Sequence, residues 1–306
     1  MAEQKVVNFM GQRKLAAILS VILLLCSVAS LAINGLKFGL DFTGGTQIEV
    51  GYQESADLEQ VRAKLSNAGF EKAVVVHFGS ETDVLVRLQQ GAKDGLGERI
   101  VAVLQEGESG TIELRRIEFV GPQVGEELRD DGGLGMLFAL VVVMVYVAMR
   151  FQFKFSVGAV AALAHDVIIV LGFFSVLGLD FDLTVLAAVL AVIGYSLNDT
   201  IVVSDRIREN FRKMRKGSAL DVINNSLTQT LGRTLVTSLT TLLVLLALFF
   251  VGGELIHGFA IALIVGVLIG TYSSIYVAAN VLLAMNIQKE DLMEPVKEGA
   301  EVDEMP

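Results

Sequence analysis

The 306-residue sequence contains little cysteine and little charge. Cys26 is the only cysteine, so no intramolecular disulfide can form, and a domain outside a membrane must be held together by its own core. Charged residues make up 19% of the chain and are clustered rather than spread evenly. The net charge is −10, and no basic region attracts nucleic acid. The single cysteine excludes a disulfide scaffold. The acidic balance means that nucleic acid is not an expected partner.

Hydrophobic residues, in contrast, are abundant and occur in long runs. They make up 53% of the chain, against about 45–50% in a soluble domain, and the mean hydropathy is +0.61. A helix needs about 20 residues to cross a hydrocarbon core. Six stretches approach or exceed that length: 14–34, 134–150, 156–178, 183–204, 234–252 and 256–284. The sequence therefore predicts a polytopic α-helical membrane protein with one polar insert.

The first apolar run has an alternative interpretation as a cleaved signal peptide, with Ser30-Leu31-Ala32 as a small-x-small cleavage site. Its apolar core, from Leu15 to Ile33, exceeds the 7–15 residues typical of a signal core. We therefore interpret it as an uncleaved membrane anchor.

The basic residues of the short loops predict the orientation. Loops 178–182 and 252–257 contain no Lys or Arg. The loops on the other side contain many: Lys5, Arg13, Lys14, Arg150, Lys154, Arg206, Arg208, Arg212, Lys213, Arg215 and Lys216. We expect a multi-pass membrane protein with both termini in the cytoplasm and the insert on the outer side of the membrane.

This orientation gives the following domain plan. The expected parts are a cytoplasmic N-terminus (1–13), transmembrane helix 1 (14–34), a periplasmic domain (35–131), a five-helix transmembrane bundle (132–284) that includes a cytoplasmic basic amphipathic segment (205–231), and an acidic cytoplasmic tail (285–306).

The insert changes from the period of membrane helices to that of strands. Strand patterns occupy 45–52, 72–79, 82–88 and 110–121, and helix patterns occupy 55–69, with Ser55 as N-cap, and 95–105. The order βαββαβ predicts an α+β ferredoxin-like domain. His77 lies on a strand without a second His or Cys, so no metal site is expected.

Two glycine-containing segments flank the insert. GLDFTGGT (39–46) leads into it, and Gly44 and Gly45 allow positive φ and a close backbone approach. GPQVGEEL (121–128) leads back to the membrane, and Gly121-Pro122 fixes a turn. A phosphate-binding role for the Gly pair is excluded, because no helix N-terminus or Lys follows it.

Polar residues are few in the apolar runs. Ionisable residues form three spots, on three separate helices. Asp199, beside Asn198, shares a helical face with Tyr195 and Ser196. The pair His165-Asp166 lies near the middle of the third run. In the fifth run, a guanidinium heads a row of hydroxyls at intervals of four: Arg233, Thr237 and Thr241.

An intramembrane carboxylate is costly and must face the bundle interior or a watery crevice. One interpretation is a structural ion pair in which Arg233 neutralises Asp199. The other is a proton relay: burial disfavours the charged carboxylate and a nearby arginine favours it, so a helix movement would capture or release a proton. No catalytic residue is expected.

The sixth run contains small residues every four positions, which let helices approach closely. These residues include Gly258, Ala262, Gly266 and Gly270. We interpret them as a packing ridge, with a pore lining as the alternative.

Five segments together resemble the SecF members of the SecD/SecF family of bacterial protein-export membrane proteins, in the RND superfamily. They are GLDFTGGT, GPQVGEEL, AHDVIIVLGFFSV (164–176), IGYSLNDTIVVSDRIREN (193–210) and QTLGRTLVTSLTTLLVLLALF (229–249). The resemblance runs from the first span through the sixth. The acidic tail lies outside it.

The resemblance implies a place in the bacterial inner membrane, with residues 35–131 in the periplasm. It also implies half of a pseudo-two-fold transporter, with SecD supplying the other half. It implies a subunit, not an enzyme, that assists the SecYEG channel, with YajC, in late preprotein export and uses the proton-motive force in place of a cofactor. Asp199 matches the family's intramembrane acid, Arg233 the arginine of the next span, and Asp41 a structural motif on the periplasmic side.

Three alternatives remain open at this stage. A structural partner would stabilise SecD without carrying protons. A small-molecule RND exporter would share the proton machinery but needs both six-span halves. An intramembrane aspartyl protease would use Asp166 and Asp199 as a dyad, although the usual Tyr-Asp and Gly-x-Gly-Asp settings are absent.

Overall fold

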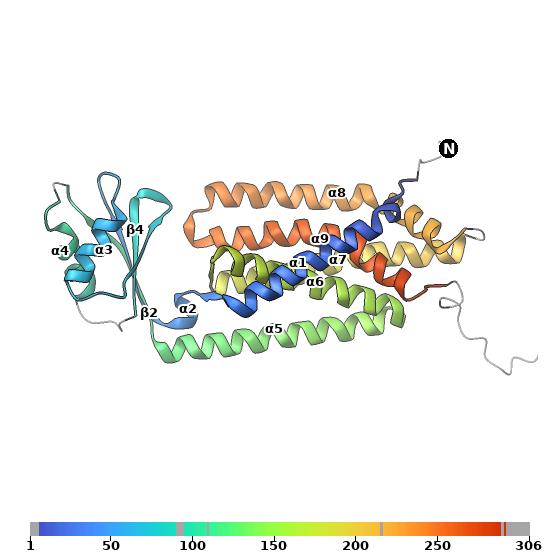
Figure 1. Cartoon of the computed structure of the whole chain (residues 1–306), viewed down its shortest axis with the longest axis horizontal. Helices are drawn as coiled ribbons and strands as arrows, with labels where there is room; N and C mark the ends of the chain where they lie inside the picture. The colour runs from blue at the N-terminus through green and yellow to red at the C-terminus, as the bar shows by residue number, and fades with distance from the viewer. Residues whose placement is uncertain (1–5, 90–94, 109, 215–216, 289–290, 292–306) are drawn as a thin grey trace, which may run out of the picture.

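The computed structural model describes residues 6–89, 95–108, 110–214, 217–288 and 291 (Figure 1). It shows a bundle of long helices with a small α+β domain at one end. Lys5, Arg215, Lys216 and, apart from Asp291, the predicted acidic tail from Lys289 onward lie outside the described residues.

Six helices are long and apolar enough to cross a membrane, which confirms the six predicted spans. They are α1 (Arg13–Ile33, preceded by the 3-10 turn Phe9–Gln12), α5 (Pro122–Arg150), α6 (Phe153–Leu177), α7 (Leu183–Lys213), α8 (Ala219–Val251) and α9 (His257–Ala284). A second 3-10 turn, Glu254–Ile256, joins α8 to α9.

Three of these helices, α5, α7 and α8, extend well beyond the predicted apolar runs. Helix α5 begins at Pro122, well before residue 134, because proline at the first helical position is pre-organised for a helix start. Hydropathy marks where a helix becomes apolar, not where its backbone begins to coil. Part of the predicted external region, 122–131, is therefore the start of α5.

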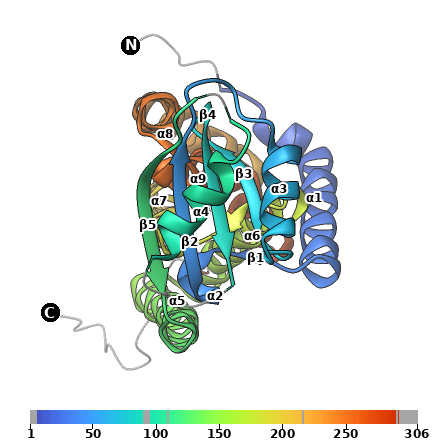
Figure 2. The same ribbon diagram turned by 90° about the vertical axis from the view of Figure 1, so that its left-hand side faces the viewer.

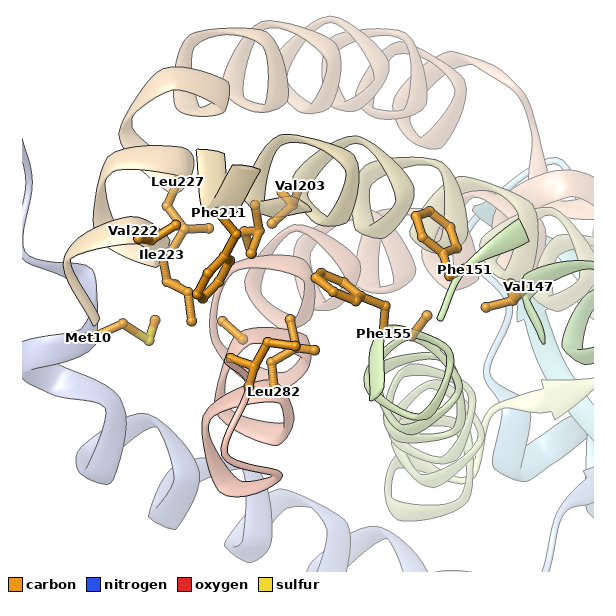
Figure 3. Close-up of a cluster of buried hydrophobic side chains, with 14 of the residues drawn as sticks. Met10, Val147, Phe151, Phe155, Val203, Phe211, Val222, Ile223, Leu227 and Leu282 are labelled. Atoms are coloured by element: carbon orange, nitrogen blue, oxygen red, sulfur yellow. The ribbon is translucent and has the colours of Figure 1, made fainter. Parts of the chain in front are cut away.

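The predicted amphipathic segment 205–231 is not a separate helix. Its first part ends α7, and its second part begins α8. Figure 3 shows why: Val222, Ile223 and Leu227 point into a buried cluster beside Phe211. The apolar face of the segment is covered by the bundle.

The α+β domain is formed by β2 (Gly45–Gly51), α3 (Leu58–Asn67), β3 (Val74–Phe78), β4 (Ser80–Leu88), α4 (Leu96–Gln105) and β5 (Glu113–Val120). Its antiparallel sheet has the order β3-β4-β2-β5. Ile48 and Val86 of the sheet pack with Leu65 of α3 and Ile100 of α4 in a core that needs no disulfide. Asp57, not Ser55, caps α3, because its carboxylate accepts the Glu59 and Gln60 amides.

Short elements join this domain to the bundle. Strand β1 (Lys37–Phe38) pairs in parallel with β6 (Asp180–Phe181), which lies between α6 and α7. The one-turn helix α2 (Leu40–Thr43) then leads into β2. Asp180 forms ion pairs with Lys37 and with Arg87 of β4. These ion pairs connect the sheet to the end of the bundle.

Figure 2 looks along the bundle from the domain end. Helix α1 lies on one side, and α5 and α8 lie toward the other, with α7 between them. Helix α1 packs on α6 and α9, where the Ser30 and Ser175 hydroxyls are 2.8 Å apart. The buried polar residues of the bundle concentrate on α6, α7, α8 and α9.

Candidate functional site

The best-connected polar group in the bundle is Asp166 on α6. Its side chain is fully buried, and one carboxylate oxygen accepts hydrogen bonds from Ser196 of α7 (2.5 Å) and Ser273 of α9 (2.6 Å). The other oxygen lies 2.8 Å from Nδ1 of His165. Three helices therefore meet on one carboxyl whose hydrogen-bonding needs are met.

The ring of His165 extends this network toward α1. It stacks on Tyr272 of α9, with ring centroids 6.1 Å apart. The Tyr272 hydroxyl donates to the Ala16 carbonyl (2.7 Å) and lies 2.9 Å from the Ser20 hydroxyl. The Asp166 network thus fixes the packing of α1, α6, α7 and α9 near the middle of the bundle.

Asp199 on α7 lies in a different environment. It is 3% exposed, and its Oδ2 has no hydrogen-bond partner among the described residues. Helices α7 and α8 are antiparallel, and Tyr195 donates to Ser238 (3.1 Å), so Asp199 lies level with Thr234. The hydroxyls of Thr200 and Thr234 are likewise buried without a partner.

Arg233 of α8 is exposed, and no ion pair joins it to a carboxylate in the described ranges. The closed ion pair with Asp199 is therefore not formed in this structure, and the role of the two charges stays a prediction. Asn198 is also exposed, on the outer side of α7.

The predicted row of hydroxyls on α8 is divided between two environments. Thr237 donates back to the Arg233 and Thr234 carbonyls of its own helix. Ser238 is buried and contacts Thr271 of α9 at 2.7 Å. Thr241 is half-buried. Ser238, and not the Thr237 face, connects α7, α8 and α9.

The flanking motifs meet at the junction of domain and bundle. An added Cβ on Gly44 would lie 2.7 Å from Pro122 Cα, and one on Gly125 would lie 2.9 Å from Gly44 N. Gly45 pairs with Val120, the residue before Gly121. Asp41 accepts the Leu183 amide (3.1 Å) at the start of α7. These residues position the domain on α5 and α7.

The small residues of α9 lie against α7. An added Cβ on Gly266 would lie 2.1 Å from Val192, and one on Gly270 would lie 3.2 Å from Ser196. Gly258 faces Val185 in the same way, and Ala262 is fully buried. The four-residue spacing thus produces a close helix contact.

The sequence interpretation missed several residues of the site. Ser273, Tyr272 and Thr271 are consecutive in α9 and carry the contacts to Asp166, α1 and Ser238. The signal present was a run of hydroxyls inside an apolar helix. The two carboxyls of the supposed protease dyad have no hydrogen bond to each other, since the hydrogen-bond partners of Asp166 are Ser196, Ser273 and His165.

Comparisons with known proteins agree on one family. A family model described as "Protein export membrane protein SecD/SecF, C-terminal" matches residues 100–288, and a "SecD/SecF GG Motif" model matches residues 29–56. Protein translocase subunit SecF of Vibrio alginolyticus is 53% identical over 99% of this chain and 98% of its own. That of Escherichia coli O157:H7 is 44% identical over 97% of this chain and 94% of its own.

A solved structure is similar as well. The crystal structure of SecDF, a translocon-associated membrane protein from Thermus thermophilus, has a TM-score of 0.83 and 38% sequence identity. The similarity covers 92% of this chain but 39% of that chain, so this chain spans well under half of the SecDF polypeptide.

Proposed function

The chain belongs to the SecD/SecF family of protein-export membrane proteins and has a role in Sec export, and we propose that it acts with SecD to drive late preprotein export and release with the proton-motive force. The observation that carries the proposal is Asp199, a buried carboxyl in a membrane helix with an oxygen that has no partner in the described structure. The proton gradient is then the energy source, with no cofactor and no chemical catalysis.

The contrast between the two buried acids assigns their roles. Asp166 has three hydrogen-bond partners, two of them on other helices, so a change in its protonation would disturb the contacts to α7 and α9 at once. Asp199 has no such constraint and can gain or lose a proton with less reorganisation. A rotation of α8 that brings Arg233 inward would favour the charged form of Asp199, and the reverse rotation would favour the neutral form.

SecD supplies the missing half of the transporter in this proposal. The outer side of α7, between α5 and α8, has an uncovered strip of mostly small residues: Ala187, Leu190, Ala191, Gly194 and Asn198. Nothing lies within 4 Å of an added Cβ on Gly194. Small residues together with one exposed amide favour association with another membrane helix. SecD bound there would lie next to the helix that carries Asp199.

The remaining parts of the proposal concern placement and further partners. The termini face the cytoplasm and the α+β domain lies in the periplasm, as the loop charges indicate. The sheet order β3-β4-β2-β5 supports a ferredoxin-like arrangement of that domain. The complex works beside SecYEG, with YajC, on preproteins that emerge on the outer side of the membrane.

The test replaces Asp199 in a strain without the native gene. Asp199→Asn keeps the size of the side chain but cannot ionise, and Asp205→Asn changes an acid at the exposed end of the same helix as a control. The readout is the rate of preprotein release with and without a proton gradient. The proposal requires that only Asp199→Asn abolishes the gradient-dependent part while the protein still accumulates with SecD.

A structural role without proton transfer is the second candidate. The observation that favours it is that Arg233 forms no ion pair with Asp199 in the described structure, although a coupling site is expected to bring the two charges together. If Asp199→Asn and Arg233→Met both keep full gradient-dependent release, the charges are architectural and the chain is a scaffold for SecD.

A further inference from the structure

Two neighbouring cavities open at the end of the bundle where α1 and α8 begin and α9 ends. The smaller has a volume of about 540 Å³ and lies between these three helices. The larger, about 920 Å³, lies between the segment before α1 and the start of α8. Arg13 and Lys14, the first residues of α1, line both cavities.

Neither of these two cations forms an ion pair in the described structure. Most other basic residues at the same end of the bundle are paired, such as Arg150 with Asp205 (2.9 Å), Lys154 with Asp291 (2.6 Å) and Lys213 with Glu209. In the ranges that the structure describes, neither Arg13 nor Lys14 has a carboxylate within 4.0 Å. Two unpaired cations at a cavity are free to bind an anion.

The smaller cavity suits an anion better than the larger one. The larger is also lined by Asp221, whose carboxylate accepts hydrogen bonds from the amide and hydroxyl of Ser218. The described lining of the smaller cavity contains no acidic side chain and adds two polar groups, Ser218 and Asn280. Its walls are otherwise small or apolar, with Ala17, Leu220, Leu283 and Ala284.

An apolar surface continues from this cavity along α1. Leu15, Ile18, Ile22 and Leu25 are between 52% and 69% exposed and recur every three or four residues, so they form one outer face. A soluble anion would contact only Arg13 and Lys14 at the start of α1. A phospholipid would place its phosphate on the cations and its acyl chains along the apolar face.

We propose that the cavity between α1, α8 and α9 is a binding site for an anionic phospholipid, with Arg13 and Lys14 holding the headgroup phosphate. The site rests only on the membrane placement of the chain and is independent of proton coupling at Asp199. Bound lipid would connect the first helix to α8 and α9, which carry the contacts described above.

The test measures lipid retained by the purified full-length chain after incubation with vesicles of phosphatidylglycerol or phosphatidylcholine. The wild-type chain should retain phosphatidylglycerol preferentially. Arg13→Gln with Lys14→Gln should weaken that retention about thirtyfold, since each of the two basic residues near an anionic surface contributes about 1 kcal/mol. Arg212→Gln with Lys213→Gln removes the same charge from the end of α7 and should leave retention unchanged. Equal loss in both double variants would show non-specific attraction and overturn the proposal.

A second variant tests the cavity without changing any charge, because loss of Arg13 and Lys14 also weakens the orientation signal of α1. Ala17→Phe fills the cavity below the two cations and should also reduce retention. Unchanged retention in Ala17→Phe contradicts a lipid site. Inorganic phosphate is the probe for a soluble anion: if it displaces phosphatidylglycerol fully at millimolar concentration, the site binds free phosphate and not lipid.

Discussion

Gly44 lies with its backbone directly against Pro122, although 77 positions separate them in the sequence. An added Cβ on Gly44 would lie 2.7 Å from the Cα of Pro122, and Gly44 has a φ of +67°. The chain leaving α1 and the chain entering α5 therefore meet backbone to backbone. This contact sets where the domain sits on the bundle.

We expect Gly44→Ala to destabilise the junction for two reasons. With a φ of 67° and a ψ of 170°, Gly44 has a backbone conformation that essentially only glycine adopts, which costs a residue with a side chain about 1–3 kcal/mol. The new methyl group would also overlap Pro122. Gly69→Ala is the matched control, since Gly69 has a φ of +89° but nothing within 4 Å of an added Cβ. Limited proteolysis of the junction should accelerate more in Gly44→Ala; equal effects would mean that the contact contributes nothing.

Gly266→Ala should weaken the packing of α9 on α7. The added methyl would lie 2.1 Å from Val192 Cγ2, so one of the helices must shift. Overpacking of this kind typically costs about 1–3 kcal/mol. Thermal denaturation in detergent measures the effect. Gly232→Ala on α8, with nothing within 4 Å, should be neutral or slightly stabilising, and a similar loss there would argue against close packing as the cause.

Ser273→Ala should destabilise the bundle by removing one donor from Asp166. A buried acceptor that loses a partner typically costs about 1–3 kcal/mol. Ser274→Ala serves as the neighbour control, because Ser274 donates only to the Thr271 carbonyl of its own helix. Thermal unfolding should show a clearly larger loss for Ser273→Ala. Preprotein release should keep its dependence on the proton gradient, since the Asp199 carboxyl is untouched.

Gly194→Leu should separate folding from assembly. Gly194 faces open space on α7, so a larger side chain has no partner to clash with inside the chain. The isolated chain should keep its thermal stability, whereas co-purification with SecD should fall. Leu239→Ile on the exposed side of α8 is a control for a changed apolar surface. Unchanged co-purification with SecD would place the interface elsewhere.

Tyr52 makes the α+β domain sensitive to alkaline pH. Burial, and then the charge of Glu108, raise the pKa of Tyr52 to about 12. The folded state therefore keeps the proton above the usual pKa of about 10, so the contribution of Tyr52 is complete below pH 10 and is lost as pH rises toward 12. Tyr52→Phe should flatten the loss of domain stability in that range. The Tyr52 hydroxyl has no hydrogen-bond partner among the described residues, so stability at pH 7 should change little.

Local physical rules explain which features could be predicted. A long apolar run indicates a spanning helix whatever it packs against. The alternation in 45–52 likewise indicated a strand without knowledge of its neighbours. Errors occurred where tertiary contacts override local signals. The segment 205–231 was predicted as one amphipathic helix, but it is divided between the end of α7 and the start of α8, and Val222 and Ile223 pack in a buried cluster.

Hydropathy, charge and periodicity are local properties, so the six spans, the two intramembrane acids and the four-residue spacing of small residues on the last helix could be predicted from the sequence. Which of the two acids has its hydrogen bonds satisfied depends on tertiary contacts. Ser196 and Ser273 come from different helices and meet on Asp166, while Asp199, one turn beyond Ser196, receives no comparable set of donors. Whether Arg233 forms an ion pair with Asp199 likewise depends on how α7 and α8 pack, and no such pair is formed in the described structure.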